Sequence, residues 1–303
     1  MEKFWIVVAP FTEFLGKNHP FSAFAKSLWL ASKALLCFSL IALFSCNPPK
    51  SQDERPTFPP TEQLRVSTEA DAYTDMLRRR VNRNGRIHYA GIRQNPRALD
   101  EYIDHMRERY SLLDNAPGRE RKAYWANLYN ALVLRLVVEH YPIASILNIG
   151  LDEDELGSPS LKEINLNHTN HPFDIALIQL GGEDYSLRRI KDDVIRGEFK
   201  DPRMHFVLVD ACQSSPRLRR NLYQGKEMNQ QLDEATREFL NDPRKNSLNP
   251  NAPVFSALFE EFARDFGGSE EALINWVNGY IPITIRPGAS ISYNSFDWGL
   301  NGY

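Results

Sequence analysis

The segment 119–140 constrains the fold more than any other part of this chain. Apolar residues recur at every fourth position of the segment: Tyr124, Leu128, Leu132 and Leu136. This spacing places them on one face of an α-helix, and Pro142 ends the pattern. The segment therefore predicts a long helix at the centre of the hydrophobic core.

Two asparagines, Asn127 and Asn130, lie within this otherwise apolar helix. A buried amide without a hydrogen-bond partner costs free energy, so both side chains must bond to something. The favoured interpretation is structural, with the amides holding the backbone of a loop. The alternative is that they orient a ligand or a catalytic group.

Further amphipathic patterns predict helices at residues 227–240 and 254–266. Gly267 and Gly268 are expected to end the second of these, because glycine readily adopts the left-handed conformation found after helices. Ser269 is expected to cap a short helix over residues 270–278, since its hydroxyl can accept a hydrogen bond from a free amide of the first turn.

Strand patterns are shorter and fewer, at residues 175–180, 205–209, 281–285 and 291–293. Gly181-Gly182 follows the first of them and predicts a hairpin turn. Helices outnumber strands and do not alternate regularly with them. The expected fold class is therefore α+β, a helix-rich single domain with a small, mostly antiparallel sheet.

The N-terminal region carries the pattern of a secretion signal. Lys26 and Lys33 precede an apolar run of twelve residues, 34–45, which ends at Cys46. A basic region, a short apolar core and a small residue before the cysteine are typical of a signal peptide. A membrane-spanning helix needs about 20 apolar residues, and Lys33 leaves too short a run. An uncleaved membrane anchor is the alternative interpretation.

The residues Leu-Phe-Ser-Cys that end at Cys46 resemble a bacterial lipobox. The resemblance implies that Cys46 becomes the mature N-terminus and carries fatty acids such as palmitate. Two acyl chains give stable attachment to a membrane. The expected location is the bacterial cell envelope, and Asn47 is compatible with sorting to the outer membrane, by resemblance to other lipoproteins.

The predicted organisation has three parts. Residues 1–45 are the signal peptide, residues 46–62 form a tether, and residues 63–303 form one domain. Five prolines lie among polar and charged residues at positions 47–60, a composition that stays extended and cannot form a core. The domain must therefore supply all of the folded structure.

Charge and cysteine content narrow the possible partners and chemistry. The formal net charge is −3 at pH 7, and no clustered basic face is visible, so nucleic acid is not an expected partner. Of the three cysteines, Cys37 leaves with the signal peptide and Cys46 carries lipid. Cys212 then remains alone, without a partner for an intramolecular disulfide. It is either buried and inert or reactive.

Nine blocks, in order, resemble one protein family. They are residues 85–89, 124–131, 141–146, 181–182, 186–187, 201–206, 215–216, 236–243 and 296–301. In this order and spacing they resemble the family called domain of unknown function 547. The resemblance spans residues 85–301 and implies a shared fold, but it brings no established activity.

The chain departs from that family where reactive residues are expected. Family members usually carry Ile-Glu-His after the Ser-Leu pair and Cys-Ala-Ser-x-Ser-Cys-Pro further on, which suggests thiol chemistry. Here the first run ends in Asp192, and the second reads Asp-Ala-Cys-Gln-Ser-Ser-Pro over residues 210–216. The resemblance therefore places Asp192 at the histidine position, and Asp210 and Ser215 at the two cysteine positions.

The candidate catalytic residues are Cys212, Ser215, His205, Asp210 and Asp192. Asp210, Cys212 and Ser215 lie in a polar loop after the predicted strand 205–209, where a rigid scaffold often carries function. His205 begins that strand. In a regular strand His205 and Cys212 point to opposite faces, so they make a poor dyad, and a buried structural thiol is favoured. A solvated surface charge is favoured for Asp192.

No metal or cofactor site is expected. His168 and His171 have the spacing of metal ligands, but no Cys, Asp or Glu within that run completes a tetrahedral site. A loop with two exposed histidines is therefore favoured over a zinc site. The glycines at 181 and 182 lack the spacing and the lysine of a phosphate-binding loop.

Two functions from different classes remain open. The favoured one is a non-catalytic envelope module, anchored to the membrane by lipid, that binds a peptide, a glycan or a protein. The alternative is a thiol- or serine-type hydrolase or transferase with a rearranged site around Asp210, Cys212 and Ser215. In that case His205 or Asp192 would act as acid or base.

Overall fold

The computed structural model describes residues 68–150 and 171–303. The chain divides into two units, Met1–Thr61 and Glu62–Tyr303, and every described residue belongs to the second. The predicted signal peptide, Cys46, the tether and His168 lie outside the described residues. Within the described ranges, no helix combines the length and the apolar character needed to cross a membrane.

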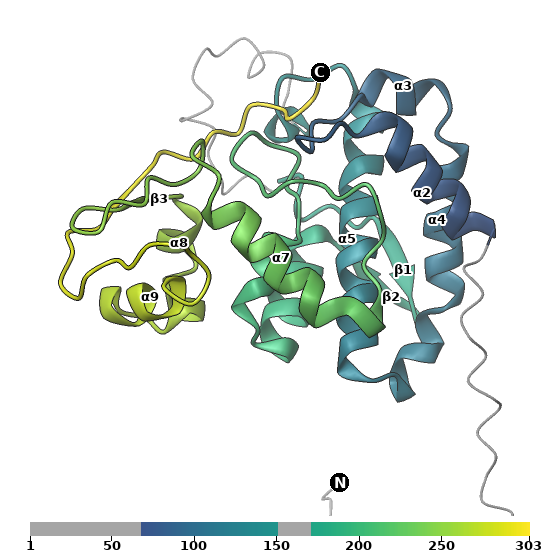
Figure 1. Ribbon diagram of the computed structural model, residues 1–303. Helices are drawn as coiled ribbons and strands as arrows, with labels where there is room; N and C mark the ends of the chain where they lie inside the picture. Colours follow the sequence, from purple (N-terminus) through teal and green to yellow (C-terminus); the bar gives the residue numbers. More distant parts are fainter. Residues whose placement is uncertain (1–67, 151–170) are drawn as a thin grey trace, which may run out of the picture. The chain divides into compact units, whose positions relative to one another are not determined.

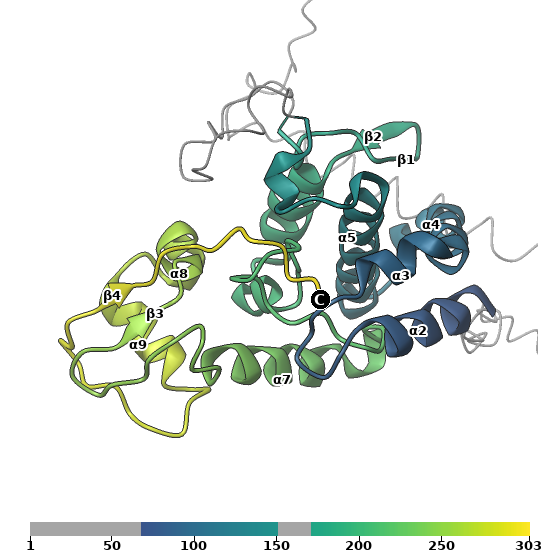
Figure 2. The ribbon, with the colours of Figure 1, turned by 90° about the horizontal axis from the view of Figure 1, so that it is seen from above.

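Helix α5 is the centre of the fold. The elements up to it are α2 (Thr68–Arg80), α3 (Tyr89–Gln94), α4 (Arg97–Glu108), the 3-10 helix η1 (Tyr110–Asn115) and α5 (Gly118–His140). Side chains on every side of α5 are buried, as expected of a helix enclosed by others. In both views α2 to α4 lie on one side of α5, and α8 and α9 lie on the other (Figures 1 and 2). The long central helix predicted from residues 119–140 is confirmed.

The second half of the described chain is less regular. It contains η2 (Ile146–Asn148), β1 (Ile178–Leu180), β2 (Glu183–Tyr185), the π-helix η3 (Arg189–Phe199), η4 (Pro202–Phe206), η5 (Gly225–Glu227), α7 (Met228–Leu240), β3 (Val254–Phe255), α8 (Leu258–Glu261), η6 (Ala263–Phe266), α9 (Glu270–Val277) and β4 (Ser292–Tyr293). Among these, α7, η3 and η5 contact α5 directly. The irregular segments are thus held by the one long helix.

The strands form two separate pairs. β1 and β2 are antiparallel, and Gly181 and Gly182 form their turn with positive φ angles, so the predicted hairpin is confirmed. β3 and β4 pair in parallel, with Val254 opposite Ser292. The helix-rich α+β class is confirmed, but the strands of the described chain make an antiparallel pair and a parallel pair rather than one sheet.

Three local predictions are wrong. Residues 205–209 are not a strand, because the 3-10 helix η4 occupies Pro202–Phe206 and an irregular buried segment follows. Residues 281–285 form no strand, and residues 254–266 are divided between β3, α8 and η6. The run 205–209 is buried by tertiary contacts that do not require a strand, whereas of residues 281–285 only Ile285 is buried.

The predicted helix ends and helix α7 agree with the structure. Helix α7 confirms most of the segment predicted at 227–240. Gly267 follows η6 with φ of 100°, and the Ser269 hydroxyl accepts from the Ala272 amide at 3.2 Å to cap α9. These signals depend on backbone geometry that the residue type alone favours, which explains their success.

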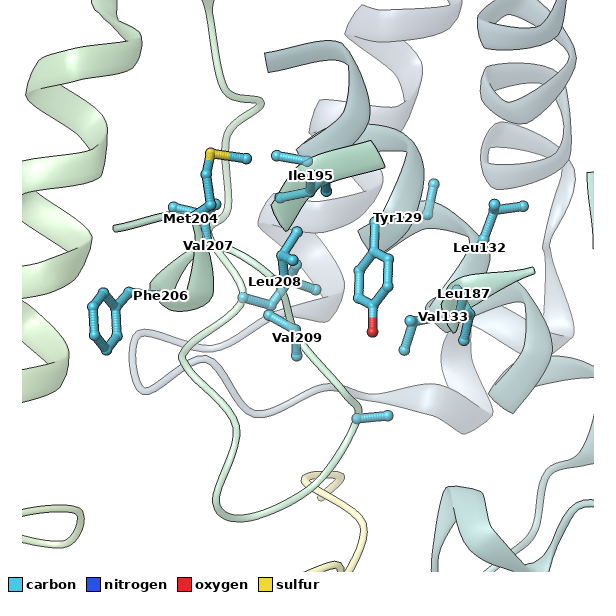
Figure 3. Packing of buried hydrophobic residues seen from close by; sticks show 14 of the residues in the cluster. Tyr129, Leu132, Val133, Leu187, Ile195, Met204, Phe206, Val207, Leu208 and Val209 are labelled. Carbon is cyan, nitrogen blue, oxygen red and sulfur yellow. The ribbon is translucent and has the colours of Figure 1, made fainter. Parts of the chain in front are cut away.

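The hydrophobic core joins α5 to the irregular chain that follows η3. Figure 3 shows Tyr129 and Val133 of α5 near Leu208 and Val209, and all four belong to the same buried cluster. Polar groups that enter this core must find partners inside it. The site described below consists of such groups.

The C-terminal residues are built into the domain. The amides of Leu300 and Asn301 donate to the carbonyls of Ala144 and Ala211 at 2.8 and 3.1 Å. The Tyr89 hydroxyl donates to Asn301 Oδ1 at 2.8 Å, within the core. The last residues therefore join three distant parts of the chain.

Truncation after Ser290 should lower the free energy of unfolding by about 3–5 kcal/mol, because these hydrogen bonds and the packing of Trp298 on Phe173 are lost. We expect the thermal midpoint to fall by about 10 °C. Leu112→Ala, at an exposed side chain outside this segment, is the control and should change the midpoint little. An unchanged midpoint after truncation at Ser290 would show that the segment is dispensable.

Candidate functional site

A buried ion pair occupies the centre of the predicted site. Lys191 Nζ, from the π-helix η3, donates to Asp210 Oδ2 at 2.9 Å. The Tyr129 hydroxyl, from α5, donates to Asp210 Oδ1 at 2.5 Å. Both oxygens of the Asp210 carboxylate are therefore engaged by internal donors. Such a site is satisfied within the protein and offers little to a substrate.

The electrostatics of this pair favour the charged forms. Burial alone would lower the pKa of Lys191, but the negative charge and the hydrogen bond of Asp210 outweigh it, so this pKa is raised. Burial and the charge of Asp210 together raise the pKa of Tyr129 well above its usual value. Lys191 therefore stays an ammonium and Tyr129 stays a phenol at neutral pH, and both act as donors.

Ser215 organises the loop that follows Asp210. Its hydroxyl oxygen accepts from the amides of Asp210 and Cys212 at 3.0 and 3.3 Å. It also lies 3.0 Å from Cys212 Sγ. The structure thus brings together three of the five candidate residues, around the Ser215 hydroxyl. This hydroxyl supports a tight turn in which Ala211 has a positive φ of 57°.

Cys212 is 1% exposed. Burial and the charge of Asp210 raise its pKa to about 12, although hydrogen bonds from Ser215 act in the opposite direction. A thiol with this pKa is protonated at neutral pH and is a poor nucleophile. The surroundings of Cys212 therefore match the buried structural thiol that the sequence favours.

His205 lies in a different cluster from Cys212. Its Nε2 lies 2.7 Å from Asp265 Oδ2, and its ring stacks on Phe262. Burial lowers the pKa of His205, although Asp265 opposes this effect. Strand alternation does not separate the two side chains, because residues 205–209 are not a strand. The separation from Cys212 comes from this pairing with Asp265.

Asp192 also lies outside the Ser215 turn. Arg196, one turn later in η3, donates to Asp192 Oδ1 at 2.8 Å and to both oxygens of Asp265 at 2.6 and 3.1 Å. The Asp192 side chain is one-third exposed, at 33%. It is an ion-paired, partly covered residue rather than the free surface charge that the sequence favours.

The two asparagines of α5 hold loop backbone, as the structural interpretation predicts. Asn127 donates to the Tyr223 carbonyl and accepts from the Tyr223 amide, both at 2.9 Å. Asn130 donates to the Val207 carbonyl at 2.8 Å and accepts from the Val209 amide at 2.9 Å. Each amide thus replaces a pair of backbone partners for a segment without regular structure.

A cavity of about 560 Å³ opens beside the Ser215 turn. Its wall includes Cys212, Ser214, Ser215 and the lysine Lys245, which follows α7. Lys245 Nζ donates to the carbonyl oxygens of Gln213 and Ser215. Sequence reasoning missed Lys245, because no motif surrounds it and its partners lie about thirty residues earlier.

One glycine allows two segments of the cavity wall to lie close together. Gly85 has φ of 74°, a conformation that side chains rarely adopt. A Cβ atom at this position would lie 2.7 Å from Arg217 Cβ and 2.9 Å from Arg217 Cα. The turn around Gly85 can therefore approach the chain after Ser215 only because position 85 carries no side chain.

Potential metal ligands do not gather in the part of the chain that is described. Residues 68–150 and 171–303 contain no group of three or more His, Cys, Asp or Glu side chains placed to hold a metal ion. His171 is buried, not exposed as predicted, and its Nδ1 accepts from the Phe173 amide at 3.3 Å. This histidine therefore helps to hold a turn.

Replacement of Lys191 by Met should destabilise the domain by about 3–5 kcal/mol, because the buried Asp210 carboxylate loses its counter-charge. Asp210→Asn in the same chain removes that charge and should restore part of the loss. Urea unfolding of the single and double variants measures both effects. Exposed Lys226→Met is the control. Equal stability of Lys191→Met and the parent would show that the pair is not structural.

Comparison with known proteins supports a family for part of the chain. No curated protein and no solved structure matches this chain. Residues 113–240 match the family described as "Protein of unknown function, DUF547". The matched segment contains α5, η3 and the Ser215 turn, and it ends before Lys245. The match supports assignment of residues 113–240 to the DUF547 domain family.

Proposed function

We propose that this protein is a lipid-anchored, non-catalytic binding module of the bacterial cell envelope. One observation carries the proposal. The carboxylates of Asp210 and Asp192, at positions where the family resemblance implies cysteine and histidine, are each held by a cation of η3. Lys191 binds Asp210, and Arg196 binds Asp192. These internal pairs leave neither position suited to nucleophilic or proton-transfer chemistry.

The surroundings of Ser215 support the same conclusion. A serine becomes a useful nucleophile when a base accepts its proton. Among the described residues, the Ser215 hydroxyl accepts from two backbone amides and shares a hydrogen bond with the Cys212 sulfur, and it has no histidine partner. His205 is held by Asp265 instead. The partners of this hydroxyl among the described residues therefore stabilise the turn, and none of them is placed to act as a general base.

The cavity beside the turn supports binding. A volume of about 560 Å³ is in the range of small-molecule sites. Its wall is rich in serine and asparagine side chains, including Asn84, Ser247, Asn294 and Ser295. Such a wall suits a hydrophilic ligand, for example part of a glycan or a peptide.

One observation favours the alternative, a serine-type hydrolase or transferase. Burial lowers the pKa of Lys245 to about 8, and this residue bonds to the backbone of Ser215. A lysine with a lowered pKa can act as a general base. However, Lys245 Nζ contacts the carbonyl oxygen of Ser215 and not its hydroxyl, so a proton transfer would require a rearranged turn.

The proposal predicts binding without turnover. Soluble glycan and peptide fragments of the cell envelope should raise the thermal midpoint of the parent, and Ser247→Trp should reduce this effect by filling the cavity. Ser290→Trp, at an exposed serine outside the cavity wall, is the matched control. Hydrolysis of a peptide or ester panel by the parent, abolished in Ser215→Ala, would show that the protein is an enzyme.

The anchor is tested separately from the cavity. In a bacterial host fed with an alkyne-tagged fatty acid, the parent should take up the label and remain in the membrane fraction. Cys46→Ser should lose the label, because the lipobox resemblance places the acyl chains on this residue. Cys37→Ser is the control and should keep it. Label retained by Cys46→Ser would contradict the lipoprotein proposal.

A further inference from the structure

We propose that the cavity beside the Ser215 turn binds a small hydrophilic oxyanion, a carboxylate or a phosphate, with the Lys245 ammonium as its counter-ion. This inference rests on the proposed binding function and specifies the chemistry of the ligand. It is carried by an incomplete set of partners around a buried cation in the cavity wall.

One of the three N–H groups of the Lys245 ammonium is not used in the hydrogen bonds described above. An ammonium carries three N–H groups. Two of them donate to the carbonyl oxygens of Gln213 and Ser215, and the second of these bonds is 2.7 Å long. For the third N–H, no further N or O acceptor lies within hydrogen-bond distance among the described residues, and the only other contact of the ammonium there is the Phe239 ring, whose centroid is 5.9 Å from Nζ. Lys245 is only 9% exposed and lines the cavity, so the cavity is the open side of this group.

The ammonium of Lys245 also has no ion-pair partner among the described residues. Within the described ranges, no carboxylate forms a salt bridge with it, and its two acceptors are neutral carbonyls. Asp242, the nearby acid, is taken by Arg244 at 2.7 Å and by Arg217 at 3.3 Å. A buried cation without a counter-ion costs free energy. An anion in the cavity would supply the missing charge.

Two more cations, Arg86 and Arg217, line the cavity wall. Arg217 pairs with Glu238 and Asp242 through its terminal nitrogens, but its buried Nε has no hydrogen-bond partner in the described structure. Arg86 donates to the Gly302 carbonyl and forms no salt bridge with a described residue. Arg86 therefore adds positive charge to the cavity wall, whereas the charge of Arg217 is compensated by its ion pairs.

The balance of charge supports an anionic ligand. The described wall holds Arg86, Arg217, Arg244 and Lys245, together with the carboxylate of Asp297. Glu238 and Asp242 compensate Arg217 and Arg244, which leaves two cations against one carboxylate. Asp297 itself accepts from the Gly299 amide at 2.8 Å. The cavity therefore keeps an excess of positive charge.

The side chains around these cations define the rest of the ligand. The described wall contains no aromatic ring on which a sugar or a base could stack. It offers hydroxyl and amide groups instead, such as those of Ser214, Ser247 and Asn294. The ligand should therefore be compact and polar over its whole surface, and its negative group should lie at Lys245.

The first test compares matched probes by isothermal titration of the full chain. Glucuronate and glucose differ in a single carboxylate, and inorganic phosphate presents the other oxyanion. We expect glucuronate or phosphate to bind, and glucose to bind at least about tenfold more weakly. The stronger of the two anions identifies the type of oxyanion. Glucose binding equal to that of both anions would overturn the inference.

The second test removes the counter-ion. Lys245→Met keeps an unbranched side chain of nearly the same length but removes the charge, and it should weaken binding of the preferred anion by about tenfold or more. Lys226→Met, at an exposed lysine outside the cavity wall, should bind like the parent. Circular dichroism shows whether each variant is folded. Full affinity in folded Lys245→Met would contradict the assignment.

A third test uses the unmodified chain and so does not depend on folding of a variant. Burial lowers the pKa of Lys245 to about 8; Cys212 and Asp242 oppose this effect, and Arg244 and Arg217 add to it. The anion requires the protonated lysine, so its affinity should fall as pH rises through about 8. Cys212 titrates near 12 and Asp242 near 2, outside this window. Constant affinity from pH 7 to about 10 would contradict the inference.

The outcomes separate this inference from the broader function. If neutral fragments bind in the cavity and neither anion does, the proposed binding function is supported and the proposed anion site at Lys245 is wrong. If the parent hydrolyses the peptide or ester panel and Ser215→Ala does not, the proposed non-catalytic function is wrong. If an anion binds with unchanged strength in Lys245→Met and in Ser247→Trp, the cavity is not its site, and this inference is wrong.

Discussion

The fold depends on hydrogen bonds between side-chain amides of α5 and the backbone of segments without regular structure. The segments around Val207 and Tyr223 lie in the core, where their backbone groups cannot reach water. Asn127 and Asn130 satisfy those groups from within the helix. A buried backbone group left unpaired costs about 1–3 kcal/mol, so these two amides permit a core that is largely irregular. Asp210, which pairs with Lys191 of η3, directly follows the segment that Asn130 holds.

Some of the helices follow from the sequence, and the strands follow only in part. Helices α5, α7 and α9 follow from periodicity and from end signals such as Ser269, which act locally. The run 205–209 looks like a strand because it is apolar, yet in the structure tertiary packing alone buries it. A short apolar run reports burial, not conformation. The parallel pairing of β3 with β4 joins segments almost forty residues apart and has no local signal.

The sequence indicates where the candidate residues gather, but it does not reveal the partners that surround them. The loop 210–216 was identified from its polar residues and from the family resemblance, and Asp210, Cys212 and Ser215 do lie together there. Their partners come from elsewhere: Tyr129 from α5, Lys191 from η3 and Lys245 from the chain after α7. Whether a carboxylate is reactive or merely paired depends on such distant residues, which spacing along the sequence does not reveal.

The position of the last residues has a consequence for how the domain assembles. The carbonyl of Gly299 and the amide of Asn301 bond to Gln213 and Ala211, and Gly302 pairs with Ile87, more than two hundred residues earlier. Contacts between residues so far apart form late in folding, because closing the loop costs conformational entropy before the new contacts stabilise the chain. A chain still being synthesised has α5 and its neighbours but lacks one side of the cavity. We expect ligand binding to appear only at the end of folding, after the helical core has formed.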